Sequence, residues 1–252
     1  MDSSNTLFVG KVLKQFASLA STNDYALLLL SKSKPSEGTV ISTLNQYQGR
    51  GQIGSTWESE AEKNINFSLI LYPTFLPVKD QFQLNQAMSL GVRDFVAEYL
   101  LNPVKVKWSN DIYVREKKVA GILIQNSLMG SQIRASVIGI GINVNQTEFV
   151  SNPHNPTSFK LETGTDFDLE KLGAALCHCL EQRYLKLKFG QADAIQSDYL
   201  NHLYRYRETA LFQRPNGIVF IGEIIGISET GKLGIRSDNE IEYFATKEIR
   251  FL

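Results

Sequence analysis

The fold is decided by three consecutive stretches, VKVKWSNDIYV (residues 104–114), KVAGILIQ (118–125) and RASVIGIGINVN (134–145). All three are rich in residues that favour strands, and short polar turns join them. They predict a sheet at the centre of the chain. Gly139 and Gly141 interrupt the last stretch. A glycine inside a strand indicates either that a ligand or another chain segment approaches closely, or that the sheet core is tightly packed.

Helices and further strands are expected on both sides of these stretches. Ser21-Thr22-Asn23 is typical of a helix start, because side-chain oxygens there can cap the free N–H groups of the first turn. Tyr25, Leu28 and Leu29 would form the apolar face of that helix. The other expected elements are strands at 38–46 and 65–73 and helices at 77–101, 168–189 and 192–206. Strands and helices mix without strict alternation, which predicts an α+β fold with a mixed sheet packed against helices.

The sequence changes character after Arg207. Short strand-like segments follow one another at close intervals, separated by the turn sequences RPNG, ETG and SDNE. This spacing predicts a small all-β domain in the form of a barrel. We therefore expect two domains, at residues 1–206 and 207–252.

Composition and charge exclude several classes of function. Lys and Arg together number 26, as do Asp and Glu, so the formal net charge is zero and condensation onto DNA or an anionic membrane is not expected. The 20 residues before Ser21 are too few for a helix-turn-helix domain, and no signal peptide or membrane-spanning run is evident. Cys177 and Cys179 are expected to be reduced thiols, which favours a cytoplasmic location. With His178 they cannot aim at one metal ion from a helix, so no metal site is expected.

Residues 49–54 match the spacing GxGxxG, which is a weak signal alone. No helix is predicted after Gly54, as a dinucleotide-binding fold would require, and no Gly-Lys-Ser/Thr sequence marks a Walker-type loop. Two interpretations remain: a loop whose N–H groups and the Arg50 guanidinium wrap an anion, or a plain solvent-exposed turn.

Lys107 is the second candidate for chemistry. In VKVKW, Val104, Val106 and Trp108 share one face of a strand, so Lys105 and Lys107 share the other. We expect Lys105 to be solvated. Lys107 is followed closely by Asn110 and Asp111, and these groups could fix a phosphate or a metal ion, or form a plain turn.

Taken in order, these pieces resemble the biotin protein ligases, from about residue 18 to residue 252. The resemblance rests on STN (21–23), QxxGRGxxGxxW (46–57), KWSND (107–111), KVAGIL (118–123) and GIGINVN (139–145). It implies a class II synthetase-like catalytic domain and an SH3-like C-terminal barrel. It also implies that the chain joins biotin to ATP, giving biotinyl-5′-AMP and pyrophosphate, and passes biotin to a lysine of a biotin carboxyl carrier domain. Biotin and ATP would be substrates, with Mg²⁺ expected from the chemistry of ATP.

The resemblance also implies roles for particular residues. Lys107 would be the central catalytic residue, its ammonium bridging the biotin carboxylate and the α-phosphate. Arg50 would close over the carboxylate and the adenylate and exclude water. Biotin would be bound by Ser21, Thr22, Asn23, Gln46, Arg50, Gly51, Gln52 and Lys107. The ATP or adenylate side would comprise Gly49, Gly54, Trp57, Asn110, Asp111 and Asn143.

The chain departs from the family pattern at Gln52, Ser109 and Gln125. Gln52 replaces a cation of GRGRRG, so Arg50 would carry more of the charge near the phosphates. Ser109 replaces the proline of KWPND, which should loosen that turn, and Gln125 stands where a Glu commonly follows the glycine motif.

Two other functions remain open on the sequence. A lipoate– or octanoate–protein ligase would share the architecture, but the polar STN and Gln46 set suits biotin better than an apolar dithiolane. A protein that binds biotin or a carrier domain without catalysis would be distinguished by a melting-temperature shift with biotin and no release of pyrophosphate.

Overall fold

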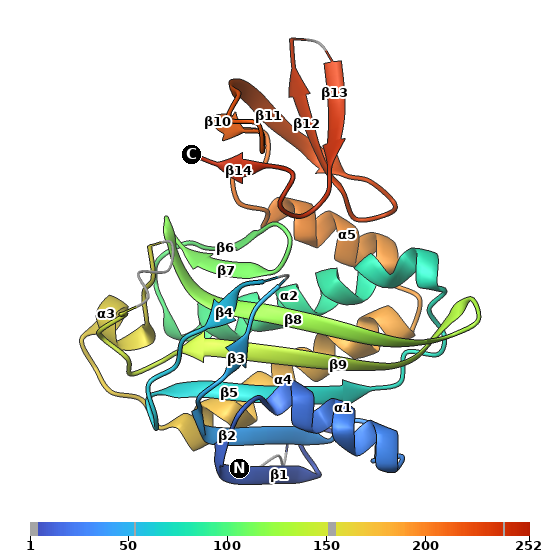
Figure 1. Ribbon diagram of the computed structural model, residues 1–252, viewed down its shortest axis with the longest axis vertical. Coiled ribbons are helices and arrows are strands. Elements are labelled where there is room, and N and C mark those ends of the chain that lie inside the picture. The colour runs from blue at the N-terminus through green and yellow to red at the C-terminus, as the bar shows by residue number, and fades with distance from the viewer. Residues whose placement is uncertain (1–4, 53, 151–154, 239) are drawn as a thin grey trace.

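The computed structural model describes residues 5–52, 54–150, 155–238 and 240–252, so Ile53 of the predicted loop lies outside the described residues. Its largest element is a seven-stranded mixed sheet in the order β1-β2-β5-β9-β8-β7-β6 (Figure 1). The strands are β1 (Leu13–Leu19), β2 (Val40–Gln46), β5 (Asn64–Leu71), β6 (Val104–Lys107), β7 (Asp111–Val114), β8 (Lys117–Met129) and β9 (Gln132–Asn143). Only β1 and β2 pair in parallel. The predicted strand at 104–114 is two strands, because a turn interrupts it after Lys107.

The helices begin largely where the capping residues predict. They are α1 (Thr22–Lys32), α2 (Gln81–Tyr99, after the 3₁₀ helix Val78–Asp80), α3 (Phe159–Thr163), α4 (Leu169–Lys188) and α5 (Ala192–Asn201). Ser21 caps α1 by accepting from the N–H of Asp24, and Asp168 caps α4 by accepting from the N–H groups of Glu170 and Lys171. The helix expected at 192–206 ends earlier, at Asn201, and α3 was not expected. Within the described residues, no helix is long and apolar enough to cross a membrane.

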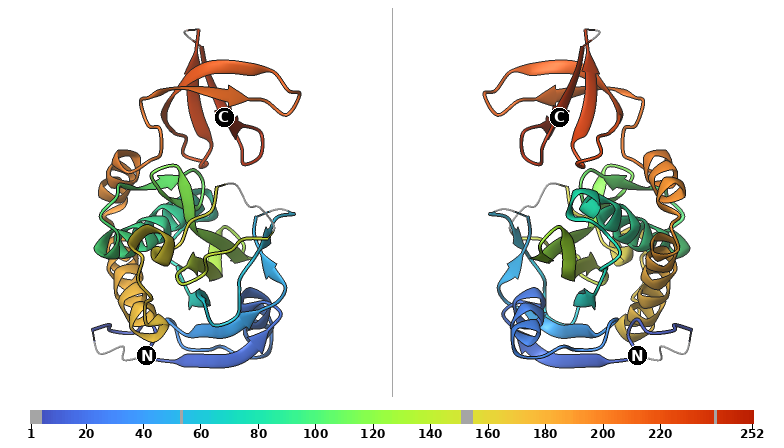
Figure 2. Two further views of the ribbon diagram at one scale, coloured as in Figure 1. Left: turned by 90° about the vertical axis from the view of Figure 1, so that its left-hand side faces the viewer. Right: turned by 90° about the vertical axis from the view of Figure 1, so that its right-hand side faces the viewer.

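The two faces of the sheet are covered differently. Helices α2 and α4 lie against one face, and α1 lies against the other (Figure 2). Strand β5 is buried along its whole length, and Phe67 and Leu69 belong to the large core on the α2 and α4 side. The alternating residues Asn66 and Ser68 contact Trp57 and Asn23 on the opposite side. The α1 face of the sheet therefore buries polar groups, which is unusual unless they are hydrogen-bonded.

Helix α1 packs against the sheet through most of the apolar face that the sequence predicts. Tyr25 and Leu29 are partly buried and lie, with the buried Ala26, against Ile41, Ile70 and Val137 of the sheet. The prediction was wrong for Leu28, which is 49% exposed. Thr22 and Asn23, at the start of the helix, are buried as well.

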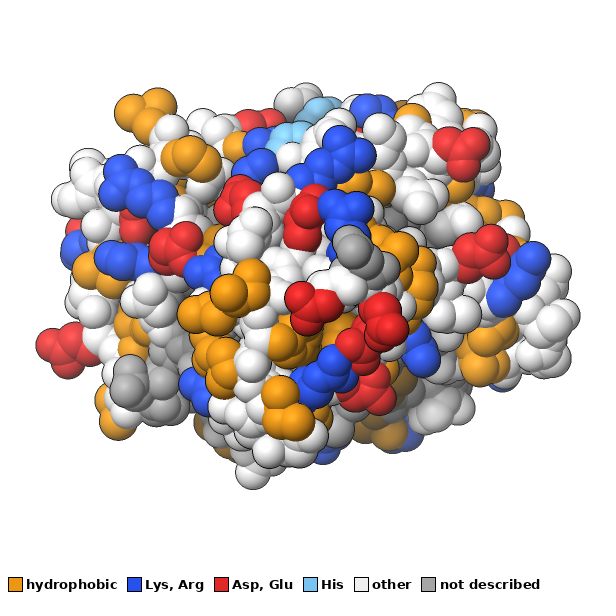
Figure 3. Space-filling model, turned by 90° about the horizontal axis from the view of Figure 1, so that it is seen from above, with side chains coloured by type: hydrophobic (Ala, Val, Ile, Leu, Met, Phe, Trp, Pro, Cys, Tyr) orange, Lys and Arg blue, Asp and Glu red, His pale blue; other side chains and the backbone are white. Residues whose placement is uncertain are grey.

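The chain after Arg207 forms a second, five-stranded antiparallel sheet, called here the C-terminal sheet. Its order is β13-β12-β11-β10-β14, with β10 (Thr209–Gln213), β11 (Val219–Ile227), β12 (Leu233–Ser237), β13 (Glu240–Phe244) and β14 (Arg250–Phe251). The predicted small β region is thus present, while its closure into a barrel stays a prediction. Seen from above, this end of the molecule carries interspersed basic, acidic and apolar side chains (Figure 3).

The turn at Gly231 contacts the rest of the molecule at two places. Trp108 of the KWSND motif is buried and donates its indole N–H to the carbonyl of Gly231, at 3.0 Å. Gly231 has φ of +84°, and a Cβ there would lie 2.5 Å from the ring of Phe82 at the start of α2. The turn before β12 therefore needs glycine at this position, for its backbone conformation and for close packing.

The segment before β1 is held by a buried carboxylate. Glu181 on α4 is 2% exposed and accepts backbone N–H bonds from Leu7, Phe8 and Val9 at 2.6–2.9 Å. A carboxylate without such donors would be costly to bury. These bonds fix the entering chain against α4.

We predict that Glu181→Ala lowers the free energy of unfolding by roughly 2–4 kcal/mol, because it leaves three backbone N–H groups without their acceptor. Urea denaturation of wild type and variant measures the difference. The exposed Glu229→Ala is the control and should change stability by less than about 0.5 kcal/mol. Equal stability of both variants would show that Glu181 does not hold this segment.

Candidate functional site

A cavity of about 180 Å³ lies on the α1 face of the large sheet. Gly121, Gly139 and Gly141 of the sheet are among the residues that line it. A Cβ on Gly139 would lie 2.4 Å from Oδ1 of Asn23, and one on Gly141 would lie 2.3 Å from the indole of Trp57. Both side chains therefore rest directly on the backbone of β9. The space over these two glycines is thus filled by tightly packed side chains, and the approach of a ligand to this strand stays a prediction.

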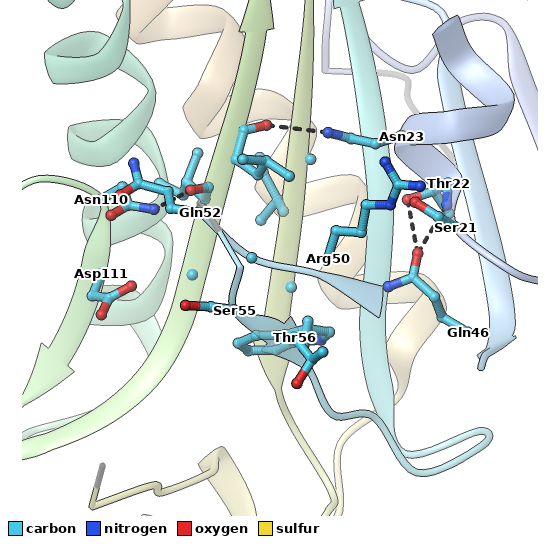
Figure 4. Close-up of a pocket in the computed structure, with 18 of the residues that line it drawn as sticks. Ser21, Thr22, Asn23, Gln46, Arg50, Gln52, Ser55, Thr56, Asn110 and Asp111 are labelled. Atoms are coloured by element: carbon cyan, nitrogen blue, oxygen red, sulfur yellow. Dashed lines mark hydrogen bonds between the residues drawn. The ribbon is translucent and has the colours of Figure 1, made fainter. Parts of the chain in front are cut away.

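The wall formed by the start of α1 is polar and hydrogen-bonded (Figure 4). Thr22 donates its backbone N–H and its hydroxyl to Oε1 of Gln46, at 2.9 and 3.2 Å. Asn23 accepts at Oδ1 from the hydroxyl of Ser68, at 2.5 Å, and donates from Nδ2 to Oε1 of Gln125, at 2.9 Å. With Ser21, these groups present neutral donors and acceptors to the cavity.

The glycine-rich segment is a small hairpin rather than an irregular loop. Strands β3 (Gly49–Arg50) and β4 (Thr56–Trp57) pair, and the N–H of Gly51 donates to the carbonyl of Ser55 at 2.8 Å. Arg50 lines the cavity and forms an ion pair with Asp24 on α1, at 3.1 Å. The hairpin thus stands over the cavity opposite the start of α1 (Figure 4).

Two of the three departures from the family pattern contact each other. Nε2 of Gln52 donates to the hydroxyl of Ser109 at 3.2 Å, and that hydroxyl can donate to Oδ1 of Asn110 at 3.1 Å. The amide of Asn110 in turn bonds the carbonyl of Ile122. The hairpin is therefore connected through Ser109 to the turn after β6.

Trp57 closes the floor of the cavity. Its indole N–H donates to Oδ1 of Asn66 at 3.0 Å, and its ring lies on Gly141. The ammonium of Lys118 lies 5.9 Å from the centre of the same ring, within the range of a cation–π contact. The position of Trp57 is thus set by contacts from β5, β8 and β9.

Lys118, on β8, lines the cavity although the sequence motifs did not mark it as a site residue. Its Nζ lies 2.7 Å from Oδ1 of Asp111, with both side chains about one quarter exposed. Its place in the KVAGIL motif, three residues before Gly121, is the signal that could have identified it. The cavity therefore contains an oriented ammonium beside Asn110 and Asp111.

Lys107 lies elsewhere and is not among the described residues that line this first cavity. Its Nζ donates to the hydroxyl of Tyr113 at 3.0 Å and lies 5.1 Å from the ring centre of Phe251. Burial lowers the pKa of Lys107, so its ammonium loses its proton at a lower pH than an exposed lysine. Its side chain thus lies against the C-terminal sheet, and its role as the bridge between the biotin carboxylate and the α-phosphate stays a prediction.

Lys107 lines a second, larger cavity of about 550 Å³, between the turn after β6 and the C-terminal sheet. Its basic lining residues are Lys107, Arg205, Lys247 and Arg250. The acidic ones are Asp111 and Glu116, and Glu116 lies 3.6 Å from Arg205. The two cavities adjoin, since Gln52, Asn110, Asp111 and Lys247 line both. The first is lined by neutral polar, apolar and glycine residues, and its charged residues are Arg50, Lys118, Lys247 and Asp111; the second has four basic and two acidic lining residues.

The structure brings together most of the predicted site residues. Those lining the first cavity are Ser21, Thr22, Asn23, Gln46, Arg50, Gly51, Gln52, Trp57, Asn110 and Asp111. Gly49 does not line the cavity, and a Cβ there would come within 2.4 Å of the carbonyl oxygen of Trp57. Gly54 is exposed at the tip of the hairpin. Asn143 is buried and donates to the carbonyl of Thr157 at 3.0 Å. Asn143 lies at the end of β9 and lines neither cavity, and its place beside the nucleotide stays a prediction.

Comparison with known proteins gives a consistent assignment. The model of the biotin/lipoate A/B protein ligase family matches residues 15–143. The bifunctional ligase/repressor BirA of Bacillus subtilis is 28% identical over 234 residues, which are 92% of this chain and 71% of that protein. The biotin–[acetyl-CoA-carboxylase] ligase of Mycobacterium tuberculosis is 26% identical over 220 residues, 86% of this chain and 80% of that protein.

A solved structure extends the likeness to nearly the whole chain. The biotin protein ligase from Aquifex aeolicus in complex with biotin and ATP matches with a TM-score of 0.79 and 26% identity, over 96% of this chain and 100% of that one. The chain belongs to the biotin/lipoate A/B protein ligase family. Within that family it is an enzyme of the biotin–protein ligase type.

We predict that Gly141→Ala weakens biotin binding at least about tenfold, because the added methyl group must displace the indole of Trp57. Gly121→Ala is the matched control, since a Cβ there would meet Trp57 and Lys118 only at 3.4 Å, an ordinary contact. Calorimetric titration with biotin measures both. Similar affinities for the two variants would mean that the position of Trp57 is not critical to the cavity.

Proposed function

We propose that the chain joins biotin to ATP, releases pyrophosphate, and transfers biotin from the resulting biotinyl-5′-AMP to a lysine of a biotin carboxyl carrier domain. The observation that carries this proposal is the pair of adjoining cavities, in which a neutral, hydrogen-bonding wall at the start of α1 is combined with the ammonium of Lys118 and with the basic residues of the second cavity. A ligand with an uncharged, hydrogen-bonding head and anionic groups beyond it fits that arrangement.

The head group of biotin suits the first cavity. A ureido ring offers two N–H donors and a carbonyl acceptor, and the wall of Ser21, Thr22, Asn23 and Gln46 offers both kinds of partner. The volume of about 180 Å³ is below the roughly 300–1,000 Å³ of drug-sized sites, which favours a compact head group. The apolar dithiolane of lipoate could not use the donors and acceptors that this wall presents.

The carboxylate of biotin would then lie toward Lys118. In adenylation a carboxylate oxygen attacks the α-phosphorus, the bond from that phosphorus to the bridging oxygen breaks, and pyrophosphate leaves with the electron pair. An ammonium between the two anions lowers the barrier because negative charge concentrates there in the transition state. Lys118, held by Asp111 and placed inside the cavity, meets this requirement better than Lys107. Arg50 on the hairpin would cover the adenylate and exclude water.

The phosphates of ATP would occupy the second cavity. Lys107 is then a phosphate-binding residue rather than the bridge between the substrates. The described residues contain no group of three His, Cys, Asp or Glu side chains that could hold a metal ion. Mg²⁺ commonly binds through one or two carboxylates together with substrate phosphates, so Asp111 is the residue that would share it with ATP. When bound, the ion would neutralise phosphate charge.

The second half-reaction and the division into domains are also proposals. The amine of the acceptor lysine would attack the acyl carbon of the adenylate, and AMP would leave. We further propose that residues 207–252 form a separate domain that closes into an SH3-like barrel. The pairing of its five strands in a sheet of their own supports this division, while its buried residues Phe212, Ile224, Ile235 and Phe244 are continuous with the large core.

The first test is pyrophosphate release with ATP and Mg²⁺, offering biotin, lipoate or octanoate separately, followed by an avidin blot with a carrier domain. We expect release with biotin only, and a labelled carrier. Release with lipoate or octanoate alone would overturn the interpretation of the polar wall. A thermal shift with biotin but no release with any of the three acids would indicate a binding protein.

The second test separates the two lysines. Lys118→Met should lower the rate of biotinyl-5′-AMP formation by roughly 10²–10³-fold, the loss typical of removing one group that stabilises developing charge. Lys107→Met should raise KM for ATP more than KM for biotin. Single-turnover kinetics with labelled ATP measures both variants. A severe loss in Lys107→Met together with a nearly normal rate in Lys118→Met would return the central role to Lys107.

A further inference from the structure

Gln125 lies beside the first cavity without lining it. Along β8, Leu123 and Gln125 face the α1 side of the large sheet, while Ile124 between them packs against the large core. Leu123 lines the cavity, but Gln125 is not among the described residues that do. Gln125 would therefore act on a ligand there through a neighbour, and Asn23, which lines the cavity and bonds Gln125, is that neighbour.

The amide of Asn23 is bonded at both of its ends. Oδ1 accepts from the hydroxyl of Ser68 at 2.5 Å, and Nδ2 donates to Oε1 of Gln125 at 2.9 Å and to the carbonyl of Leu123 at 3.4 Å. A backbone carbonyl can only accept, so Nδ2 must be the end of the amide that faces β8. Because Asn23 is buried, turning its amide over would set its oxygen against the oxygen of Leu123 at a cost in free energy.

The two acceptors of Nδ2 are not equivalent. The bond to Gln125 has the usual length of an N–H···O hydrogen bond, whereas the bond to Leu123 is long. The side chain also has little room to shift toward a better partner, since a Cβ on Gly139 would lie 2.4 Å from Oδ1 of Asn23. The orientation of the Asn23 amide therefore depends chiefly on Gln125 at one end and on Ser68 at the other.

We propose that Gln125 is a positioning residue, which holds the amide of Asn23 in the orientation that a ligand of the first cavity meets. The identity of that ligand, the ureido head of biotin, rests on the proposed function, whereas the bond between the two side chains does not. Gln125 stands where the family pattern commonly has Glu. A carboxylate offers the same acceptor, so Gln125 supplies the bond without adding a charge to the wall.

The test compares two substitutions of Gln125 with a control. Gln125→Met removes the acceptor and nearly keeps the size, and Gln125→Glu restores an acceptor. Asn126→Leu is the control, because Asn126 is the next residue of β8 but bonds Gln81 and Ser136 instead of Asn23. Calorimetric titration with biotin and, separately, with ATP measures the affinity of each variant.

We expect Kd for biotin to rise about five- to tenfold in Gln125→Met, as for the loss of one neutral hydrogen bond. Gln125→Glu and Asn126→Leu should stay within about twofold of wild type, and Kd for ATP should be unchanged in all three. In the background of Asn23→Ala, adding Gln125→Met should have no further effect, because the residue through which it acts is gone. A further rise of the same size in that background would show that Gln125 acts by another route.

The outcomes separate this inference from the proposed function. Unchanged biotin affinity in Gln125→Met overturns the role of Gln125, and so does a failure of Gln125→Glu to restore the affinity. If the wild type does not bind biotin, the proposed function fails. NMR of protein labelled with ¹⁵N-asparagine then decides the role of Gln125. The side-chain amide protons of Asn23 should exchange with water more slowly in wild type than in Gln125→Met, and equal exchange would overturn the inference.

Discussion

The site depends on two positions of β9 that carry no side chain. Asn23 and Trp57 lie so close to Gly139 and Gly141 that a single methyl group would collide with either one. The start of α1, the hairpin of β3 and β4, and the sheet can approach one another only because this backbone is bare. The polar groups that line the cavity are therefore oriented by packing, and little rearrangement is needed to present them to a ligand.

The departures from the family pattern form contacts of their own. Gln52 bonds Ser109, and Gln125 accepts from Asn23. A neutral amide thus takes the place of a cation on the hairpin and of an acid on β8, and each amide is satisfied by a polar partner. The wall of Thr22, Asn23 and Gln46 is consequently neutral, and the charges of the cavity lie in two ion pairs, Arg50 with Asp24 and Lys118 with Asp111.

Much of this arrangement can be predicted from the sequence, because its causes are local. The caps at Ser21 and Asp168 depend on neighbouring residues, and the helix starts follow from them. The exposure of Leu28 could not be foreseen, since it depends on what lies under α1. Which cavity each lysine lines is also set by distant parts of the chain. Lys118 lines the first cavity, whereas Lys107 lines the second and lies 5.1 Å from the ring centre of Phe251, at the end of the chain.

The bonds from Glu181 to the backbone of residues 7–9 also determine where the chain enters the molecule. His178, one turn earlier on α4, lies 3.0 Å from the carbonyl oxygen of Asn5. Helix α4 covers the face of the large sheet opposite α1 and the hairpin (Figure 2). A tag, dye or fused protein joined ahead of these residues would therefore lie on the far side of the molecule from both the start of α1 and the hairpin. This end is the natural point for immobilising the enzyme with the first cavity facing solvent.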